Sequence, residues 1–167
     1  ESRGFEAAEE IRHRNVNLGL AEDLEDINNF IIVDDSYGYN AISVAPYAVQ
    51  SESYVLFAER ENIQDVMDFL QDTEVDEILI YGFVDREVRS ALQQYNPDII
   101  STGDRFENNV EIVKRFLEIK DREQVILSNG EFIEDSIMAG DDPVLFIGRA
   151  SVPQVTRNFV RESEFDV

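Results

Sequence analysis

Five short apolar runs, separated from one another by amphipathic or polar sequence, constrain the fold of this 167-residue chain more than any other feature. Each run is continuous and rich in β-branched or aromatic residues, as expected of strands that are covered on both faces. The runs occupy residues 30–33, 54–57, 78–81, 125–127 and 144–147. Because strands that alternate with helices through short connections form parallel sheets, the sequence predicts an α/β fold with a mainly parallel sheet.

Apolar residues recur at helical spacing between these runs. The three clearest stripes lie in residues 63–70, 84–92 and 106–117. A further helix is predicted for residues 4–14, and a loop or short helix for residues 15–29. Asn62 and Ser151 are expected to cap the helices that follow them. With helices on both faces of the sheet, the expected architecture is a three-layer, Rossmann-like fold.

The order of apolar and polar residues occurs twice along the chain. Residues 30–45 align with residues 125–140, and residues 55–57 align with residues 144–146. The first alignment sets Tyr37 opposite Phe132, Asn40 opposite Asp135 and Ile42 opposite Ile137. Self-similarity of this kind predicts an internally duplicated fold.

The duplication suggests where the two units meet. Phe5 and the glutamate after it match Phe106 and the glutamate after that, at the predicted start of a helix in each unit. We therefore predict a first repeat over residues 1–102 and a second over residues 103–167. The second is expected to be truncated, with its third strand beginning near residue 165 and its sheet edge covered by a neighbouring domain or protomer.

Four motifs follow one another in this frame. The first is Asn-Ala-Ile-Ser-Val-Ala-Pro-Tyr-Ala at residues 40–48, and the second is Ile-Leu-Ile-Tyr-Gly-Phe-Val at residues 78–84. The third is Gly-Asp-Arg-Phe-Glu at residues 103–107, and the fourth is Leu-Ser-Asn-Gly-Glu-Phe-Ile-Glu-Asp-Ser at residues 127–136. In this order they resemble the cell wall-binding repeat 2 family. Its corresponding motifs are Asp-Ala-Leu-Ser-Ala-Ala-Pro-Leu-Ala, a third strand before Gly-Gly, Gly-x-Asp-Arg-Tyr-x-Thr-Ala, and a strand that ends in a small residue and glycine. Residues 108–109, both asparagine, stand where the family has Thr-Ala.

This resemblance implies a Rossmann-like fold in a larger secreted protein of the cell surface, of the S-layer-associated kind. It implies a non-catalytic, extracellular module for anchoring to the envelope or assembling it. The implied partners are envelope glycan or protein, neighbouring repeats or a second copy of the chain. Asn40, Asp104, Arg105 and Asp135 stand in the matching motifs and are candidate binding residues. A structural alternative is that Asp104 caps the helix that begins at Arg105, which then pairs with a loop carboxylate.

Charge restricts the partners further. The chain has 36 acidic and 14 basic residues, a net charge of −22 and a sequence pI near 4.1. Such a surface repels nucleic acid and anionic membranes. Only Lys114 and Lys120 are lysines, and an acidic, lysine-poor composition is typical of adaptation to high salt, with an ordinary acidic protein as the alternative. An archaeal-type surface role suits this charge better than attachment to anionic wall polymers. No apolar run approaches the roughly 18 residues that span a bilayer.

Most catalytic chemistries lack their residues here. Cysteine is absent, which excludes thiolate catalysis and cysteine metal sites, and His13 is the sole histidine. Neither a Gly-x-Gly-x-x-Gly sequence nor a Walker-type loop follows any predicted strand. The sequence therefore predicts a protein that is not an enzyme. The alternative is a divergent Rossmann-like enzyme or small-ligand-binding domain, which a deep polar pocket at the carboxyl ends of the strands would favour.

Two pairs of neighbouring aspartates lie in loops beside predicted strands, namely Asp34 with Asp35 and Asp141 with Asp142. Carboxylate oxygens suit the flexible coordination of Ca²⁺, so both pairs are candidate calcium sites. No other cofactor is expected. Phosphoryl transfer at Asp34 and Asp35 is disfavoured, because the first hundred residues contain no lysine to pair with a phosphoryl group.

Overall fold

The structure is a computed structural model that describes residues 16–24, 26–131, 135–163 and 165. The helix predicted for residues 4–14 and the match of Phe5 to Phe106 lie outside the described residues. Four parallel strands form the larger sheet, in the order β2-β1-β3-β4. These strands are β1 (Asn29–Val33), β2 (Ser53–Phe57), β3 (Glu77–Tyr81) and β4 (Asp98–Ile100).

A second sheet holds two more parallel strands, β5 (Ile126–Ser128) and β6 (Val144–Phe146). All five strands predicted from the apolar runs are therefore present, and the mainly parallel α/β fold is confirmed. The apolar runs did not predict β4, because this strand has three residues and begins with an exposed aspartate, Asp98. Its pairing with β3 supplies the backbone hydrogen bonds that so short a segment does not specify by itself.

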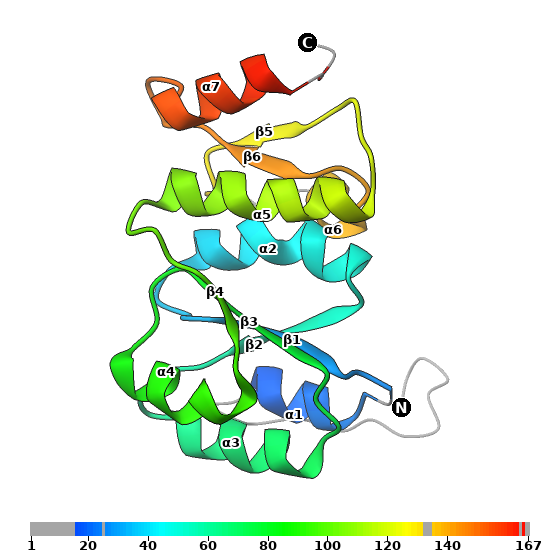
Figure 1. The fold of residues 1–167 in the computed structure, drawn as a ribbon, viewed down its shortest axis with the longest axis vertical. Coiled ribbons are helices and arrows are strands. Elements are labelled where there is room, and N and C mark those ends of the chain that lie inside the picture. The colour runs from blue at the N-terminus through cyan, green and yellow to red at the C-terminus, as the bar shows by residue number, and fades with distance from the viewer. Residues whose placement is uncertain (1–15, 25, 132–134, 164, 166–167) are drawn as a thin grey trace, which may run out of the picture.

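Helices separate and cover the two sheets (Figure 1). On the lower face of the larger sheet lie α1 (Val16–Glu22), α3 (Ile63–Asp72) and α4 (Arg86–Leu92), the last continued by a 3-10 turn (Gln93–Tyr95). Between the sheets lie α2 (Gly38–Gln50) and α5 (Arg105–Ile119), with α6 (Asp135–Ala139) packed against α2. Beyond the second sheet lies α7 (Gln154–Glu162). The two sheets thus share one layer of helices.

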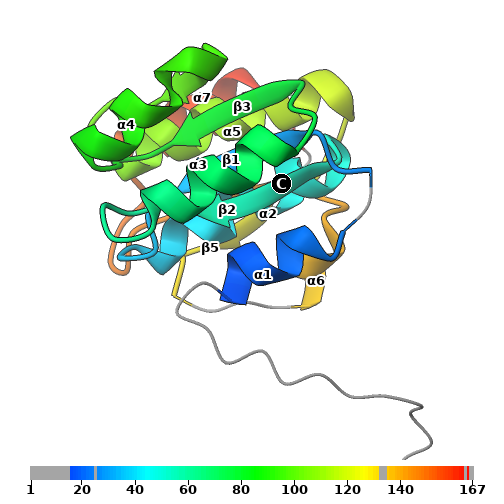
Figure 2. The ribbon, with the colours of Figure 1, turned by 90° about the horizontal axis from the view of Figure 1, so that it is seen from below.

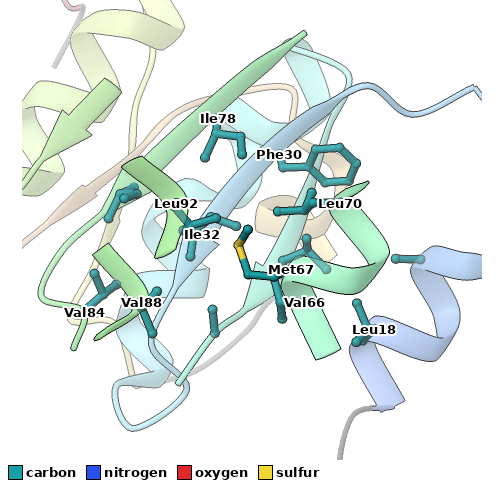
Figure 3. Packing of buried hydrophobic residues seen from close by; sticks show 14 residues of the cluster. Leu18, Phe30, Ile32, Val66, Met67, Leu70, Ile78, Val84, Val88 and Leu92 are labelled. Carbon is teal, nitrogen blue, oxygen red and sulfur yellow. The ribbon is translucent and has the colours of Figure 1, made fainter. Parts of the chain in front are cut away.

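Both faces of the larger sheet are buried, as the continuous apolar runs predicted. Phe30 and Ile32 of β1 lie against α3 and α4, where Met67 and Leu70 of α3 enter the same cluster (Figure 3). The alternate residues of β1 pack on the opposite face with α2 and α5. Successive side chains of a β-strand point to opposite faces of the sheet, so one continuous apolar run contributes to the core on each face.

The repeat is visible in the backbone after each first strand. The amide of Ala58 donates to the Val33 carbonyl at 2.9 Å, and the amide of Ile147 donates to the Ser128 carbonyl at the same distance. These residue pairs correspond in the alignment of the two units. The loops also match, because Asp34 and Asn129 each accept a hydrogen bond from the amide two residues later, at 2.8 and 3.0 Å. The predicted boundary between residues 102 and 103 stays a prediction.

Neither predicted helix cap forms through its side chain. Asn62 occupies the N-cap position of α3, but its side chain makes no capping hydrogen bond there and instead bonds the Phe57 carbonyl and the Glu59 amide. Ser151 does not cap α7, because that helix begins at Gln154 with Pro153 at the N-cap. The Ser151 carbonyl instead accepts from the Gly148 amide at 2.9 Å, which closes the preceding turn.

Candidate functional site

The predicted binding residues follow the carboxyl ends of parallel strands, where α/β folds usually bind ligands. Asn40 lies in the first turn of α2, after β1, and is 4% exposed. Its amide packs on Gly82 at the end of β3, where the backbone has a φ of 79° and a Cβ would come within 3.0 Å of the Asn40 side chain. The strand order changes direction between β1 and β3, so Asn40 fills the point at which a Rossmann-like crevice would open.

Asp104 caps α5. One of its carboxylate oxygens accepts hydrogen bonds from the amides of Phe106 and Glu107, at 2.8 and 3.0 Å. A carboxylate at this end of a helix satisfies free amides and opposes the positive end of the helix dipole. The capping role that the sequence suggested for Asp104 is therefore confirmed, and whether Asp104 also binds a ligand stays a prediction.

Arg105 is held by aromatic rings. Its guanidinium carbon lies 5.3 Å from the centre of the Tyr39 ring and 4.6 Å from that of Phe106. The expected pairing of Arg105 with a loop carboxylate does not occur among the described residues, and cation–π contacts take its place. Burial raises the pKa of Tyr39, and the Tyr37 and Asp34 charges add to this effect while Arg105 opposes it. Arg105 therefore presents a positive charge beside the rings of Tyr39 and Phe106 at this edge of the fold.

Asp135 is separated from the other candidates. It begins α6, is exposed, and shares no hydrogen bond or ion pair with Asn40, Asp104 or Arg105. Asn40 stands at the corresponding position of the first unit and is buried there, because β3 and Gly82 cover it. Within the described residues, no strand lies beside β5 in the place that β3 takes beside β1. The two aligned positions thus have different surroundings.

Of the four predicted calcium ligands, Asp34 and Asp35 belong to an acidic cluster. Glu59, which follows β2, joins them, and the closest carboxylate oxygens of the three residues lie within 4.8 Å of one another. A hydrogen bond to Asp35, together with burial and the neighbouring carboxylates, raises the pKa of Glu59 to about 7. The sequence did not indicate Glu59, because only the pairing of β1 with β2 brings it beside Asp34 and Asp35.

Asp141 and Asp142 are neutralised by basic side chains instead. Lys120 donates to Asp141 at 3.0 Å, and the Arg122 guanidinium lies 3.7 Å from Asp141 and 3.6 Å from Asp142. The hydrogen bond from Lys120 lowers the pKa of Asp141. Among the residues that the structure describes, neither aspartate belongs to a group of three acids that could share an ion. The predicted calcium site therefore has better geometry at Asp34 and Asp35.

A buried chain of polar side chains joins the two sheets. The Tyr81 hydroxyl of β3 lies 2.6 Å from the Ser43 hydroxyl of α2, which accepts from Asn109 Nδ2 of α5 at 2.8 Å. Asn109 is fully buried; its Nδ2 also donates to the Val144 carbonyl and its Oδ1 accepts from the Phe146 amide. A single asparagine therefore satisfies the free edge of β6 and ties it to the larger sheet. In the sequence, Asn109 stood out only as a departure from the family motif, and nothing indicated this structural role.

Asn17 performs the same task on the other sheet. Its Nδ2 donates to the Val55 carbonyl at 2.8 Å, and its Oδ1 accepts from the Phe57 amide at 3.0 Å. Val55 and Phe57 are the residues of β2 that align with Val144 and Phe146 of β6. The helices α1 and α5 thus hold corresponding strand edges with the same side chain, which no feature of the sequence around Asn17 had indicated.

Comparisons with known proteins bear on the fold. No family model matches the chain, and no curated protein matches it. Among solved structures, Cwp6 from Clostridium difficile aligns with a TM-score of 0.71 and 18% sequence identity, over 86% of this chain and 26% of that one. Cwp8 from Clostridium difficile aligns with a TM-score of 0.67 and 18% identity, over 86% of this chain and 27% of that one.

The shared feature is the fold. The chain spans about a quarter of the length of either protein. The likeness agrees with the fold that the cell wall-binding repeat resemblance implies, and an identity of 18% carries nothing finer than that. None of the helices in the described ranges combines the length and the apolar composition that crossing a membrane requires.

Proposed function

We propose that this chain is a non-catalytic module of a cell-surface protein, and that it anchors its protein to the cell envelope or helps to assemble the envelope. The observation that carries the proposal is the fold likeness to Cwp6 and Cwp8, which are cell wall proteins, over 86% of the chain. The order of the repeat motifs supports the same conclusion. The module acts outside the cell, and its partner is envelope glycan or protein.

The packing at the carboxyl ends of the strands also supports a role without catalysis. In enzymes with this topology, the crevice between β1 and β3 is the usual place for a substrate or cofactor. Here the buried amide of Asn40 occupies that place against Gly82. A small-ligand-binding domain is the second candidate, and a metabolite that co-purifies in equal molar amount with the protein would favour it.

Arg105 is the residue that we propose meets the envelope partner. Its guanidinium is fixed by Tyr39 and Phe106 and is partly exposed, so little conformational entropy is lost when it binds. Tyr37, which is 43% exposed, packs against Tyr39 with 5.5 Å between ring centres. A fixed cation beside aromatic rings suits sugar rings that carry acidic groups, and also suits the acidic side chains of an envelope protein.

Two experiments test this proposal. The first is fractionation of cells that produce the native protein, with detection by antibody; we expect the protein in the envelope fraction. The second is co-sedimentation of the purified chain with isolated envelopes. Arg105→Gln should weaken that binding several-fold. The matched control is Arg89→Gln, which removes an exposed arginine from α4 and should bind as the unchanged chain does.

Recovery of the native protein only from the cytosol would contradict the envelope role. Equal envelope binding by the Arg105→Gln and Arg89→Gln variants would leave the envelope role standing but would remove Arg105 from it. Melting temperatures of both variants should stay within a degree of the unchanged chain, so that weaker binding is not confused with unfolding.

A further inference from the structure

The turn that follows β5 contains the one place in the sequence where glycine follows asparagine, Asn129 before Gly130. Such a pair is chemically labile, because glycine has no side chain to hinder attack by its backbone nitrogen on the asparagine side chain. Figure 2 shows β5 and α6, between which this turn lies, at one side of the molecule. Asn129 is partly exposed there, so water reaches its side-chain amide.

Hydrogen bonds fold the Asn129 side chain back over its own backbone. Its Oδ1 accepts from the Glu131 amide at 3.0 Å, and its Nδ2 donates to the Glu131 carboxylate at 3.1 Å. A turn of this kind brings the side-chain amide carbon to the backbone of the residue between the two, which is Gly130. The Gly130 amide donates to Ser128 Oγ at 3.0 Å, and a hydroxyl can both accept a proton and donate one to water. The turn therefore holds the two reacting groups together and offers a path for the proton.

We propose that Asn129 deamidates spontaneously in the folded protein. The Gly130 nitrogen attacks Cγ of Asn129, the bond between Cγ and Nδ2 breaks, and the proton lost by Gly130 leaves with the amide group as ammonia. The product of this step is a five-membered succinimide ring. Water then opens the ring at either of its carbonyl carbons, which leaves aspartate or isoaspartate at position 129. The net reaction consumes one water, releases one ammonia and needs neither an oxidant nor a reductant.

The first unit shows that the aspartate product fits the turn. Asp34 stands at the position that aligns with Asn129, and its Oδ1 accepts from the Ser36 amide at 2.8 Å. An aspartate at position 129 keeps this bond but loses the donor that Nδ2 supplies to Glu131. It also places a second negative charge beside Glu131, which already pairs with Arg149.

The isoaspartate product does not fit, because it adds a methylene group to the backbone beside Gly130. That backbone is tightly packed: a Cβ on Gly130 would lie 3.1 Å from Tyr39 Cβ and 3.2 Å from Phe146 Cζ, and its φ is 75°. Moving Gly130 therefore moves Tyr39, whose ring lies 5.3 Å from the Arg105 guanidinium. Isoaspartate thus loosens Arg105, and only the effect of this change on envelope binding rests on the proposed function.

The test is incubation of the purified chain for several days at pH 8 and at pH 5.5, followed by peptide mapping. Electron-transfer fragmentation distinguishes isoaspartate from aspartate. Asn158 is an internal control, since it is exposed and precedes Phe159 in α7. We expect conversion at position 129 to be several-fold faster than at position 158, and faster at pH 8 because the Gly130 nitrogen must lose its proton. In the Asn129→Gln variant, which cannot form the five-membered ring, position 129 should stay unchanged.

Nuclear magnetic resonance of the Arg105 side chain tests the second step. The rings of Tyr39 and Phe106 should shift the Arg105 Nε–H resonance in the unchanged chain. We expect this shift to shrink in the incubated chain that holds isoaspartate. The Asn129→Asp variant, which has the normal backbone, should keep it. Circular dichroism checks that the incubated chain and both variants remain folded.

Equal conversion at positions 129 and 158, or conversion at position 129 only in urea, would overturn deamidation in the folded protein. An unchanged Arg105 resonance in the chain that holds isoaspartate would overturn the link from Gly130 to Arg105. Loss of the ring shift together with normal sedimentation with envelopes would support this inference. That result would count against Arg105 as the envelope contact, so the two proposals can fail separately.

Discussion

Asn17 and Asn109 make the same two hydrogen bonds, each to a carbonyl and an amide two residues apart on an outer strand of its own sheet. An asparagine side chain presents a donor and an acceptor in one plane, as a neighbouring strand would. It therefore satisfies backbone groups that an unpaired edge would leave free, and it blocks that edge against pairing with another chain. The equivalence also relates α1 to α5, and so it defines where the repeat begins more firmly than the aligned apolar residues do.

We expect Asn109→Ala to destabilise the chain by about 2–3 kcal/mol, because it leaves the Val144 carbonyl and the Phe146 amide buried without a partner. Asn17→Ala should cost about 1 kcal/mol, since Asn17 is only partly buried and water can replace its side chain. Urea unfolding followed by circular dichroism measures both. Equal losses would show that burial does not decide the strength of this bond pair.

The hydroxyl of Tyr81 is the far end of the same buried chain. Burial raises the pKa of Tyr81, and the bond with Ser43 opposes this effect. Ser43→Ala should cost about 1–3 kcal/mol, since it strands both the tyrosine hydroxyl and one hydrogen of Asn109. Tyr81→Phe should cost about 1 kcal/mol. The double variant should lose less stability than the sum of the losses in the two single variants, because the shared bond is removed only once. Strict additivity in urea unfolding would contradict the contact.

Sequence reasoning succeeded where the signal was local. The run at residues 30–33 fixed β1, and Asp104 fixed the start of α5, because burial on both faces and capping each depend on a few neighbouring residues. It failed for the polar residues whose partners are distant. Asn109 and Ser43 are 66 positions apart, and only the stacking of the two sheets brings them together. Glu59 escaped notice for the same reason.

The sequence also did not predict that the two sheets share one layer of helices. The amphipathic stripes predicted helices on both faces of a sheet, and α3, α4 and α5 satisfy that expectation. They did not indicate that α2 would meet β6 with its other side, because a helix that is apolar on two sides has no clear single stripe. The candidate residues Asn40 and Asp135 looked equivalent in the alignment, and tertiary contacts made one buried and left the other exposed.

Glu59 should make stability fall as the pH rises. Its folded-state pKa is raised to about 7 from an ordinary value of 4.5, so the folded chain holds a proton that the unfolded chain releases. The stability is therefore fully present below pH 4.5 and is lost between pH 4.5 and 7. Glu59→Gln should stabilise the chain by up to about 1 kcal/mol at pH 8, a figure reduced for solvent screening, and have little effect at pH 4.5. Thermal melts at the two pH values test this expectation.

Calcium binding at Asp34 and Asp35 stays a prediction. The proton that Glu59 holds at low pH provides a way to test it. An ion in this cluster must compete with the proton on Glu59, so Ca²⁺ should bind more tightly at pH 8 than at pH 5.5. Isothermal titration calorimetry at both pH values measures this, and Asp141→Asn serves as a control that should leave binding unchanged. Tighter or equal binding at pH 5.5 would exclude the cluster as the ion site.

Two variants of Asp104 can separate its capping of α5 from a role in binding a partner. Asp104→Ala should lower stability by about 1 kcal/mol, because it removes the acceptor for two amides at the start of α5. Asp104→Ser keeps a cap and should recover most of that loss. If Asp104 also binds a partner through its charge, Asp104→Ser will be stable yet will sediment poorly with envelopes. A stable Asp104→Ser variant that binds normally would restrict Asp104 to the cap.

The last prediction concerns salt. With 36 acidic against 14 basic residues, repulsion between like charges should outweigh the few surface ion pairs at low ionic strength. Raising NaCl from about 0.1 M to 2 M shortens the screening length from about 10 Å to below about 3 Å, and so should raise the melting temperature by several degrees.

Salt also strengthens apolar burial, so a second comparison is needed. Glu22 and Asp72 line one acidic groove between α1 and α3. The variant Glu22→Gln with Asp72→Asn should melt above the unchanged chain at 0.1 M NaCl and with it at 2 M. A difference that persists at 2 M would mean that screening is not the cause.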